Sequence, residues 1–360
     1  MNLLITAEQQ ILQDSLEQLF SRYAPLTSDK TGEGLWQQLA DELGVVGLCA
    51  PEQFGGGGGT FADLAVVMEA MGRCLYSGPY LSSAVLAVHT LLLAEDVAVQ
   101  CDHLRDLASG HRIGAVIAQD LSDVAERISA TSVGGGITLS GTASSVFDGG
   151  HAELLLVFAE EGDQQSLFLV DASAAGVTRM ALTSLDLRRS AGEVVFRETP
   201  ARRIGNPGSA AEIVPRLRQI ASLAIAAEQV GGASRCLDDA REYASVRYQF
   251  GRPIGSFQAV QHACADMYQR VRSGHVAVRH AARCLDAGSP ESATAAAMAK
   301  IYCAEAYLHC AAANLQIHGG MGFTWEEGCH LHYRRARASA MWAGGPDRHR
   351  QWLADHLLAG

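Results

Sequence analysis

The sequence predicts an α+β protein in which two helical regions flank a small antiparallel β domain. Three observations predict this order. Apolar residues recur at helical spacing in residues 1–111, their period falls toward two in 112–205, and alanine-rich helical spacing returns in 206–360. A chain of 360 residues is long enough for two or three subdomains around a large core. We therefore expect an N-terminal helical domain, a middle β domain and a C-terminal four-helix bundle.

The N-terminal region begins with the pattern of a capped amphipathic helix. Thr6 and Gln9 have the spacing of a capping box. One apolar stripe follows, made of Ile11, Leu12, Leu16, Leu19 and Phe20. Further helices are predicted over 35–43, after Thr60 and Asp63, and over 81–107. The glycine-rich stretch 51–61 lacks the Lys-Ser/Thr ending of a phosphate-binding loop, so we interpret it as a connection.

The middle region contains short apolar runs separated by Gly, Ser and Thr, which is typical of strands. The candidate strands are 113–118, 136–141, 153–159, 166–170 and 192–196. The C-terminal region predicts four helices, at about 210–247, 256–286, 291–316 and 348–358. Alanine-rich helices of this kind pack closely, as in a bundle.

Composition limits the classes of function. The net charge of −11 argues against a nucleic-acid surface. No run of 18 apolar residues predicts a membrane span, and the first residues lack the basic segment of a signal peptide. The nine cysteines include no CxxC pair, so we expect reduced thiols in a cytoplasmic protein. Cys303 and Cys310, with His309 nearby, fit core packing better than a metal site, and no metal site is predicted.

Two segments carry the clearest functional signal. Residues 247–258 are RYQFGRPIGSFQ, and residues 316–323 are QIHGGMGF. They resemble the two cofactor-contacting segments of the acyl-CoA dehydrogenase family, and similarity to that family extends over nearly the whole chain. The resemblance implies that these segments, called here the cofactor segments, reach across a dimer interface. There they would hold the diphosphate and adenine end of FAD bound by the neighbouring subunit.

The residue types in the cofactor segments suit that task. Arg247 can make a bidentate charged contact, and glycines let the backbone approach a ligand closely. The resemblance predicts FAD contact by Arg247, Gln249, Phe250, Gln258, Gln316, Ile317 and Gly320. We add His318 and Gly319 to this set, because they lie inside the second segment. The plainer alternative is that both segments only end one helix and turn into the next.

The other half of the family's site is eroded. The family segment that holds the flavin ring corresponds to 118–123, where its glycines and proline are missing. A second flavin-facing segment corresponds to Ser145, Val146 and Phe147, with a hydroxyl in place of the stacking aromatic. The two positions known for the catalytic carboxylate fall on Ala343 and Ala221, and alanine cannot accept a proton.

Glu228 is then the remaining candidate for a catalytic base. It lies seven residues beyond Ala221, on the same face of the predicted helix. The alternative is that Glu228 is a buried, paired carboxylate without a catalytic role.

The resemblance implies one subunit of a heterotetrameric, FAD-dependent acyl-CoA dehydrogenase, similar to bacterial members that act on steroid side chains. The implied partners are a catalytic subunit bearing the base, an acyl-CoA substrate and an electron-transfer flavoprotein. Two alternatives remain open. The chain could be a self-sufficient homo-oligomeric flavoenzyme with a relocated acid or base, or a scaffold that binds no flavin.

Overall fold

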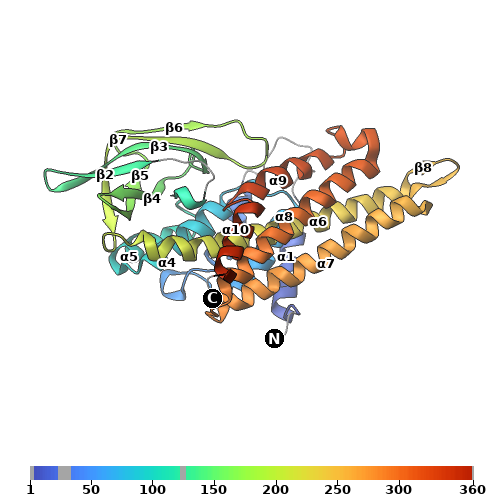
Figure 1. Ribbon diagram of the computed structural model, residues 1–360, viewed down its shortest axis with the longest axis horizontal. Coiled ribbons are helices and arrows are strands. Elements are labelled where there is room, and N and C mark those ends of the chain that lie inside the picture. The colour runs from blue at the N-terminus through green and yellow to red at the C-terminus, as the bar shows by residue number, and fades with distance from the viewer. Residues whose placement is uncertain (1–3, 23–33, 122–126, 359–360) are drawn as a thin grey trace.

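The computed structural model describes residues 4–22, 34–121 and 127–358, and it confirms the predicted order of three regions. The β domain lies at one end of the molecule, and long helices run from it toward the opposite end (Figure 1). A small hairpin extends that opposite end.

The N-terminal region is helical, as predicted. Its elements are α1 (Ala7–Ser21), α2 (Leu35–Asp41), η1 (Val45–Gly47), η2 (Glu52–Phe54), α3 (Phe61–Arg73), the π-helical η3 (Tyr80–Ala87), α4 (Val88–Ala94) and α5 (Val97–Ala108). The predicted capping box of Thr6 with Gln9 is present, and Thr60 with Asp63 forms another at the start of α3. The glycine-rich stretch is a loop that folds back on η1, since Gly57 N donates to Gly47 O at 3.0 Å.

The β domain is a strongly bent sheet that closes on itself. Its strands are β1 (Gly114–Ile117), β2 (Ile128–Val133), β3 (Gly136–Phe147), β4 (Leu154–Glu161), β5 (Gln164–Asp171), β6 (Val177–Ala181) and β7 (Ala191–Ile204). Strands β4, β2, β3, β7 and β5 form a ring, because β5 also pairs with β4. Closure leaves these strands without free edges.

Two details of the β prediction need correction. The domain is not purely antiparallel, because β1 pairs with β4 in parallel, with Gly114 opposite Leu154. Strands β2 and β6 were not predicted. Most of their residues are exposed, so they lack the apolar alternation that marks a strand with one face in the core.

The C-terminal region is an alanine-rich bundle, with one helix more than predicted. Its helices are α6 (Ala210–Val246), α7 (Gln258–Asp286), α8 (Ser292–His318), α9 (Cys329–Met341) and α10 (Pro346–Leu358). The missed helix, α9, packs on α8 and α6. Its sequence is rich in Arg and His, and one of its fully buried positions is Arg335. The helix was missed because it lacks the apolar stripe that marks a helix face in the core. No helix in the described ranges is both long and apolar enough to span a bilayer.

A glycine contact fixes the crossing of α3 and α6. A Cβ on Gly72 would lie 1.9 Å from Glu228 O, and a Cβ on Gly231 would lie 1.9 Å from Glu69 O. Both positions therefore require glycine at this separation of the helices. The close crossing buries Glu228 between α3 and the rest of the bundle, with 2% of its surface exposed.

Candidate functional site

The two cofactor segments, far apart along the chain, meet at one end of the bundle. The first begins where α6 ends, with Arg247 N donating to Tyr243 O at 2.9 Å. The second begins in the last turn of α8. The rings of Tyr243 and His318 stack with centroids 4.1 Å apart, which joins the two helix ends. The two segments thus lie at the end of the bundle opposite the β domain (Figure 1).

The first segment forms a hairpin of β8 (Tyr248–Gln249) and β9 (Arg252–Pro253). Its two-residue turn places Phe250 at φ +55° and Gly251 at φ +79°. A phenylalanine in this left-handed region costs about 1 kcal/mol. The Phe250 side chain is also 91% exposed. A strained, solvent-facing aromatic at a hairpin tip suggests a surface shaped for another molecule.

The second segment leaves its backbone open. Gly319 adopts φ +59° and ψ −134°, which glycine alone adopts readily. A Cβ on Gly320 would meet no atom of this chain within 4 Å, so internal packing does not require glycine there. Close approach of an outside group to this backbone would require it.

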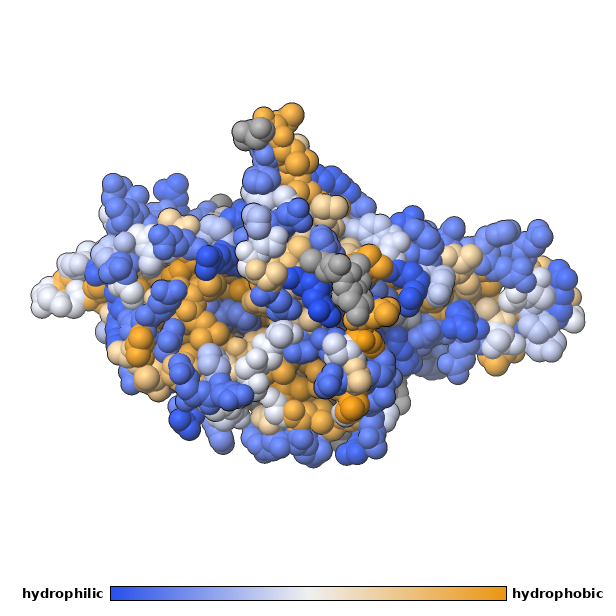
Figure 2. Space-filling view, turned by 90° about the horizontal axis from the view of Figure 1, so that it is seen from below, coloured by the Kyte–Doolittle hydropathy of each residue, from blue (hydrophilic) through white to orange (hydrophobic). Residues whose placement is uncertain are grey.

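The predicted side chains around these turns also face outward. Arg247, Gln249, Gln258 and Gln316 are exposed, and Ile317 is half-buried. In the space-filling view this end of the molecule is a narrow extension with apolar and polar side chains intermixed (Figure 2). Guanidinium, amides, open backbone and an aromatic ring on one exposed surface fit the diphosphate and adenine end of FAD.

His318 differs from the rest of the predicted set. It is 5% exposed, its ring lies against Tyr243, and its Nδ1 is 3.0 Å from Asn314 O. Its Nε2 is 4.0 Å from a carboxylate oxygen of Glu327. The side chain therefore supports the end of α8 from inside, and FAD contact by His318 stays a prediction.

A second region, the interdomain junction, lies where the β domain meets the turn between α9 and α10. The rings of Phe147 and Trp342 meet edge to face, with centroids 4.9 Å apart. The Arg189 guanidinium lies 4.8 Å above the Trp342 ring. Ala343 N donates to Leu121 O at 3.2 Å. The flavin-facing positions Leu121 and Phe147 thus both contact the turn that carries Trp342 and Ala343, and these residues do not fit a flavin ring. Ser122 and Asp123 lie outside the described residues.

A buried ion network stabilises the interdomain junction. One Arg189 nitrogen donates to both oxygens of Glu228, at 2.5 and 2.7 Å. Arg335 donates to Glu228 and to Asp186, and its third nitrogen donates to Tyr76 O at 3.2 Å. Although burial opposes it, the two carboxylates hold the pKa of Arg335 above its usual value. Both Glu228 oxygens are therefore held by guanidinium groups, as expected of a structural carboxylate.

Comparison with known proteins agrees with the fold. Family models match the acyl-CoA dehydrogenase N-terminal domain at residues 6–111 and the acyl-CoA dehydrogenase C-terminal domain at residues 219–358. Acyl-CoA dehydrogenase IpdE2 of Mycobacterium tuberculosis is 31% identical over 351 residues, which cover 94% of each chain. The chain belongs to the acyl-CoA dehydrogenase family.

Two solved structures of family members are also similar over their whole length. The ChsE4–ChsE5 complex from Mycobacterium tuberculosis has 29% identity and a TM-score of 0.91, covering 100% of each chain. A variant of the steroid acyl-CoA dehydrogenase Tcur3481–Tcur3483 has 31% identity and a TM-score of 0.86, covering 98% of each chain.

The resemblance places the catalytic base at two positions. Both positions are buried alanines in this chain. Ala221 is 1% exposed within α6, and Ala343 is 2% exposed in the turn before α10. Neither side chain can accept a proton.

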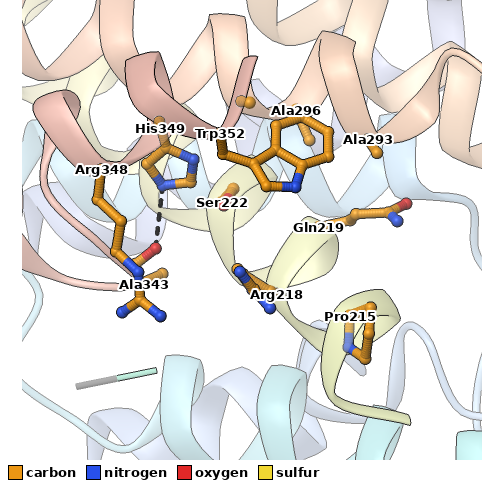
Figure 3. Close-up of a pocket in the computed structure, with 11 residues that line it drawn as sticks. Pro215, Arg218, Gln219, Ser222, Ala293, Ala296, Ala343, Arg348, His349 and Trp352 are labelled. Atoms are coloured by element: carbon orange, nitrogen blue, oxygen red, sulfur yellow. Dashed lines mark hydrogen bonds between the residues drawn. The ribbon is translucent and has the colours of Figure 1, made fainter. Parts of the chain in front are cut away.

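A cavity of about 150 Å³ lies beside Ala343 (Figure 3). Its lining comes from α6, α8, α10 and the turn before α10: Pro215, Arg218, Gln219, Ser222, Ala293, Ala296, Ala297, Ala343, Arg348, His349 and Trp352. Small apolar side chains form one part of it, and Arg218 and Arg348 bring positive charge to another. This mixture suits an amphipathic anion. Sequence reasoning missed the cavity, because its lining residues lie far apart in the sequence, from Pro215 to Trp352.

His349 closes the cavity next to Ala343. Its Nε2–H donates to Ala343 O at 3.0 Å (Figure 3). Burial, with Lys300 nearby, lowers the pKa of His349 to about 4. The imidazole is therefore neutral at physiological pH and holds the turn in place.

Five of the nine cysteines are buried, three are half-buried, and Cys101 is exposed. All nine are free, and Cys303 and Cys310 are buried, with their thiols facing the carbonyls of Gly274 and Met267. Of the groups in the described ranges, His280, Cys284 and Glu291 come together with metal-ligand spacing. The sequence showed the four-residue step from His280 to Cys284, but the position of Glu291 depends on the turn between α7 and α8.

Proposed function

We propose that this chain is the non-catalytic subunit of a heteromeric, FAD-dependent acyl-CoA dehydrogenase. It would supply the cross-interface contacts to FAD bound by a partner subunit that carries the catalytic base. The observation that supports this most directly is the closed interdomain junction, where Phe147, Trp342 and Arg189 pack against each other. The cofactor segments, in contrast, are open and face outward.

The chemistry of the reaction explains why a partner is needed. Forming a 2,3-enoyl-CoA requires removal of an α-proton by a base within hydrogen-bonding reach. FAD, when bound, accepts the hydride from the β-carbon. In this chain the expected base positions are Ala221 and Ala343, and Glu228 is held by Arg189 and Arg335. The proton acceptor must therefore come from the other subunit.

This chain's own contribution would be to bind and orient the cofactor. Arg247 would pair with a diphosphate oxygen, and the open backbone at Gly319 and Gly320 would admit the same group closely. Phe250 would cover an apolar face of the adenine end. A half-site of this kind functions only within an oligomer.

The relatives suggest the kind of partner and substrate. ChsE4–ChsE5 is a complex of two proteins, and Tcur3481–Tcur3483 is a steroid acyl-CoA dehydrogenase. We therefore propose a second family member as the partner and a steroid-derived acyl-CoA as the substrate class. An electron-transfer flavoprotein would accept the electrons, as the family resemblance implies.

The test is the flavin content of the chain purified alone and after co-expression with a base-bearing family member. We expect a colourless protein alone and one FAD per heterodimer in the complex, read from the visible spectrum. About one FAD per chain in the protein alone would overturn the proposal in favour of a homo-oligomeric flavoenzyme. No flavin in either preparation would favour a scaffold.

A matched pair of variants assigns the cofactor contact to this chain. In the co-expressed complex, Arg247→Ala should weaken FAD retention about 100-fold, because removing one partner of a charged contact costs about 2–5 kcal/mol. Arg22→Ala, at a surface ion pair with Glu42 near the end of α1, is the control and should retain FAD normally. Equal retention by both variants would show that Arg247 does not reach the cofactor.

A further inference from the structure

His280 and Cys284 lie one helical turn apart on α7 and share one face of it. Cys284 Sγ is 3.8 Å from His280 Nε2 and 4.0 Å from Nδ1. Two such ligands on one tetrahedral zinc ion, with Zn–S of about 2.3 Å and Zn–N of about 2.05 Å, would be about 3.6 Å apart. The observed separation is therefore close to that of a shared metal ion.

A third ligand comes from a different part of the chain. The Glu291 carboxylate, just before α8, completes a cluster whose ligand atoms all lie within 4.8 Å of one another. A histidine nitrogen, a thiolate and a carboxylate are a donor set that zinc uses. The thiolate disfavours magnesium and calcium, which prefer oxygen ligands.

The turn that positions Glu291 is held by hydrogen bonds of its own. Cys284 O accepts from Ser289 N and from Ser292 Oγ, both at 2.9 Å. Glu291 N donates to Ser289 Oγ at 3.2 Å. Gly288, at φ +57°, lets the chain reverse after α7. The backbone that carries the three ligands is thus preorganised.

Burial across the cluster leaves one side open. Cys284 is 1% exposed, His280 is half-buried and Glu291 is exposed. A cation could enter from the Glu291 side and keep a water as its fourth ligand. The buried thiol is poorly placed to attack a substrate, so a nucleophilic role for the Cys284–His280 pair does not fit.

The charges of the three ligands suit a divalent cation, since a coordinated thiol loses its proton. One thiolate and one carboxylate would balance the charge of the ion, with the imidazole neutral.

We propose that His280, Cys284 and Glu291 bind one zinc-class divalent cation that clamps the turn between α7 and α8. The site lies at the end of α7 away from the cofactor segments, about 40 Å along the helix. It is therefore a structural site, distant from the cofactor segments. Bound metal would stabilise the connection from α7 to α8.

The experiment uses the full chain, first treated with chelator and then titrated with Co²⁺ as a spectroscopic probe. We expect one equivalent to bind, with a thiolate-to-cobalt charge-transfer band in the near ultraviolet that Zn²⁺ abolishes by displacement. Cys284→Ser should remove the band. His280→Ala and Glu291→Gln should each weaken binding at least tenfold. Cys101→Ser, at an exposed thiol on α5, is the matched control and should leave the band unchanged.

Two results would overturn the proposal. One is the absence of a charge-transfer band at stoichiometric Co²⁺, and the other is a band that persists in Cys284→Ser. If Cys284→Ser does not fold, Glu291→Gln still gives a test, because its side chain is exposed. Zn²⁺ should raise the melting temperature of the wild-type chain and do so much less in Glu291→Gln. Equal Zn²⁺ shifts in both proteins would contradict the site.

Discussion

The cofactor end of the bundle and the interdomain junction differ in almost every physical respect. At the cofactor end, Phe250 is 91% exposed and strained, and the backbone at Gly320 is open. At the interdomain junction, Arg335 and Glu228 are almost fully buried and hydrogen bonded to each other. Both regions belong to one acyl-CoA dehydrogenase fold.

The comparison distinguishes an exposed surface suited to another molecule from a region that is packed within the chain. At the cofactor segments, Gly320 is a glycine that no neighbouring atom of this chain requires. At the interdomain junction, the side chains contact one another and so stabilise the chain itself. A subunit that only completes a cofactor site in its partner would need the exposed cofactor segments but no open site at its own interdomain junction. This is the reason for the proposed division of labour.

The largest predicted effect lies in the buried ion network. Glu228→Gln should lower the free energy of unfolding by about 3–5 kcal/mol, because it leaves Arg189 and Arg335 without their shared counter-charge. Urea denaturation of the isolated chain measures this loss. Glu305→Gln is the matched control, at an exposed pair with Arg350, and should have a far smaller effect.

The same variant tests the alternative role of Glu228. If Glu228 were a catalytic base, Glu228→Gln would abolish turnover in the complex while leaving stability near that of the wild type. That outcome would break the comparison between the two regions, because the interdomain junction would then be a working site.

The order of the three regions was predictable because it depends on local patterns, and short motifs marked the cofactor segments, whose contact with FAD stays a prediction. Hydrophobic period marked the regions, and short motifs marked Arg247 and Gln316. The interdomain junction was not predictable in the same way. Glu228 meets partners 39 and 107 residues away, and Arg335 in sequence looks like a surface residue of a basic helix. Their burial depends on how α3, α6 and α9 pack together, which local sequence patterns do not show.

Two buried histidines, His332 on α9 and His349 on α10, should make the stability of the chain depend on pH. Burial, with Arg235 nearby, lowers the pKa of His332 to about 3, and burial lowers that of His349 to about 4. In the unfolded chain both would have the ordinary value of about 6.5. The unfolded state therefore takes up protons first as the pH falls. The stability contributed by each neutral histidine is present above pH 6.5 and is lost toward its folded-state pKa.

Between pH 7.5 and 5.5 this linkage should cost about 1.4 kcal/mol of unfolding free energy for each histidine. Urea midpoints at the two pH values measure the fall. His332→Gln should remove about half of the part due to these two residues, whereas His111→Gln, at an exposed histidine, should remove none. A pH dependence unchanged in His332→Gln would mean that this buried ring takes up a proton as readily as an exposed one.

The smallest predicted effect has opposite signs in the isolated chain and in the complex. Phe250→Asn should stabilise the isolated chain by about 0.5 kcal/mol, because asparagine tolerates the left-handed backbone better than phenylalanine. Loss of the edge contact with Phe257, whose ring centroid is 6.1 Å away, reduces this gain. In the co-expressed complex the same variant should weaken FAD retention about tenfold, since the aromatic face is lost.

Phe323→Asn, at an exposed aromatic with no positive φ, is the control and should give no gain in stability. If Phe250→Asn both stabilises the isolated chain and weakens FAD retention in the complex, the strained conformation of Phe250 serves contact with the cofactor. Loss of stability in the isolated chain would instead mean that Phe250 stabilises this subunit itself.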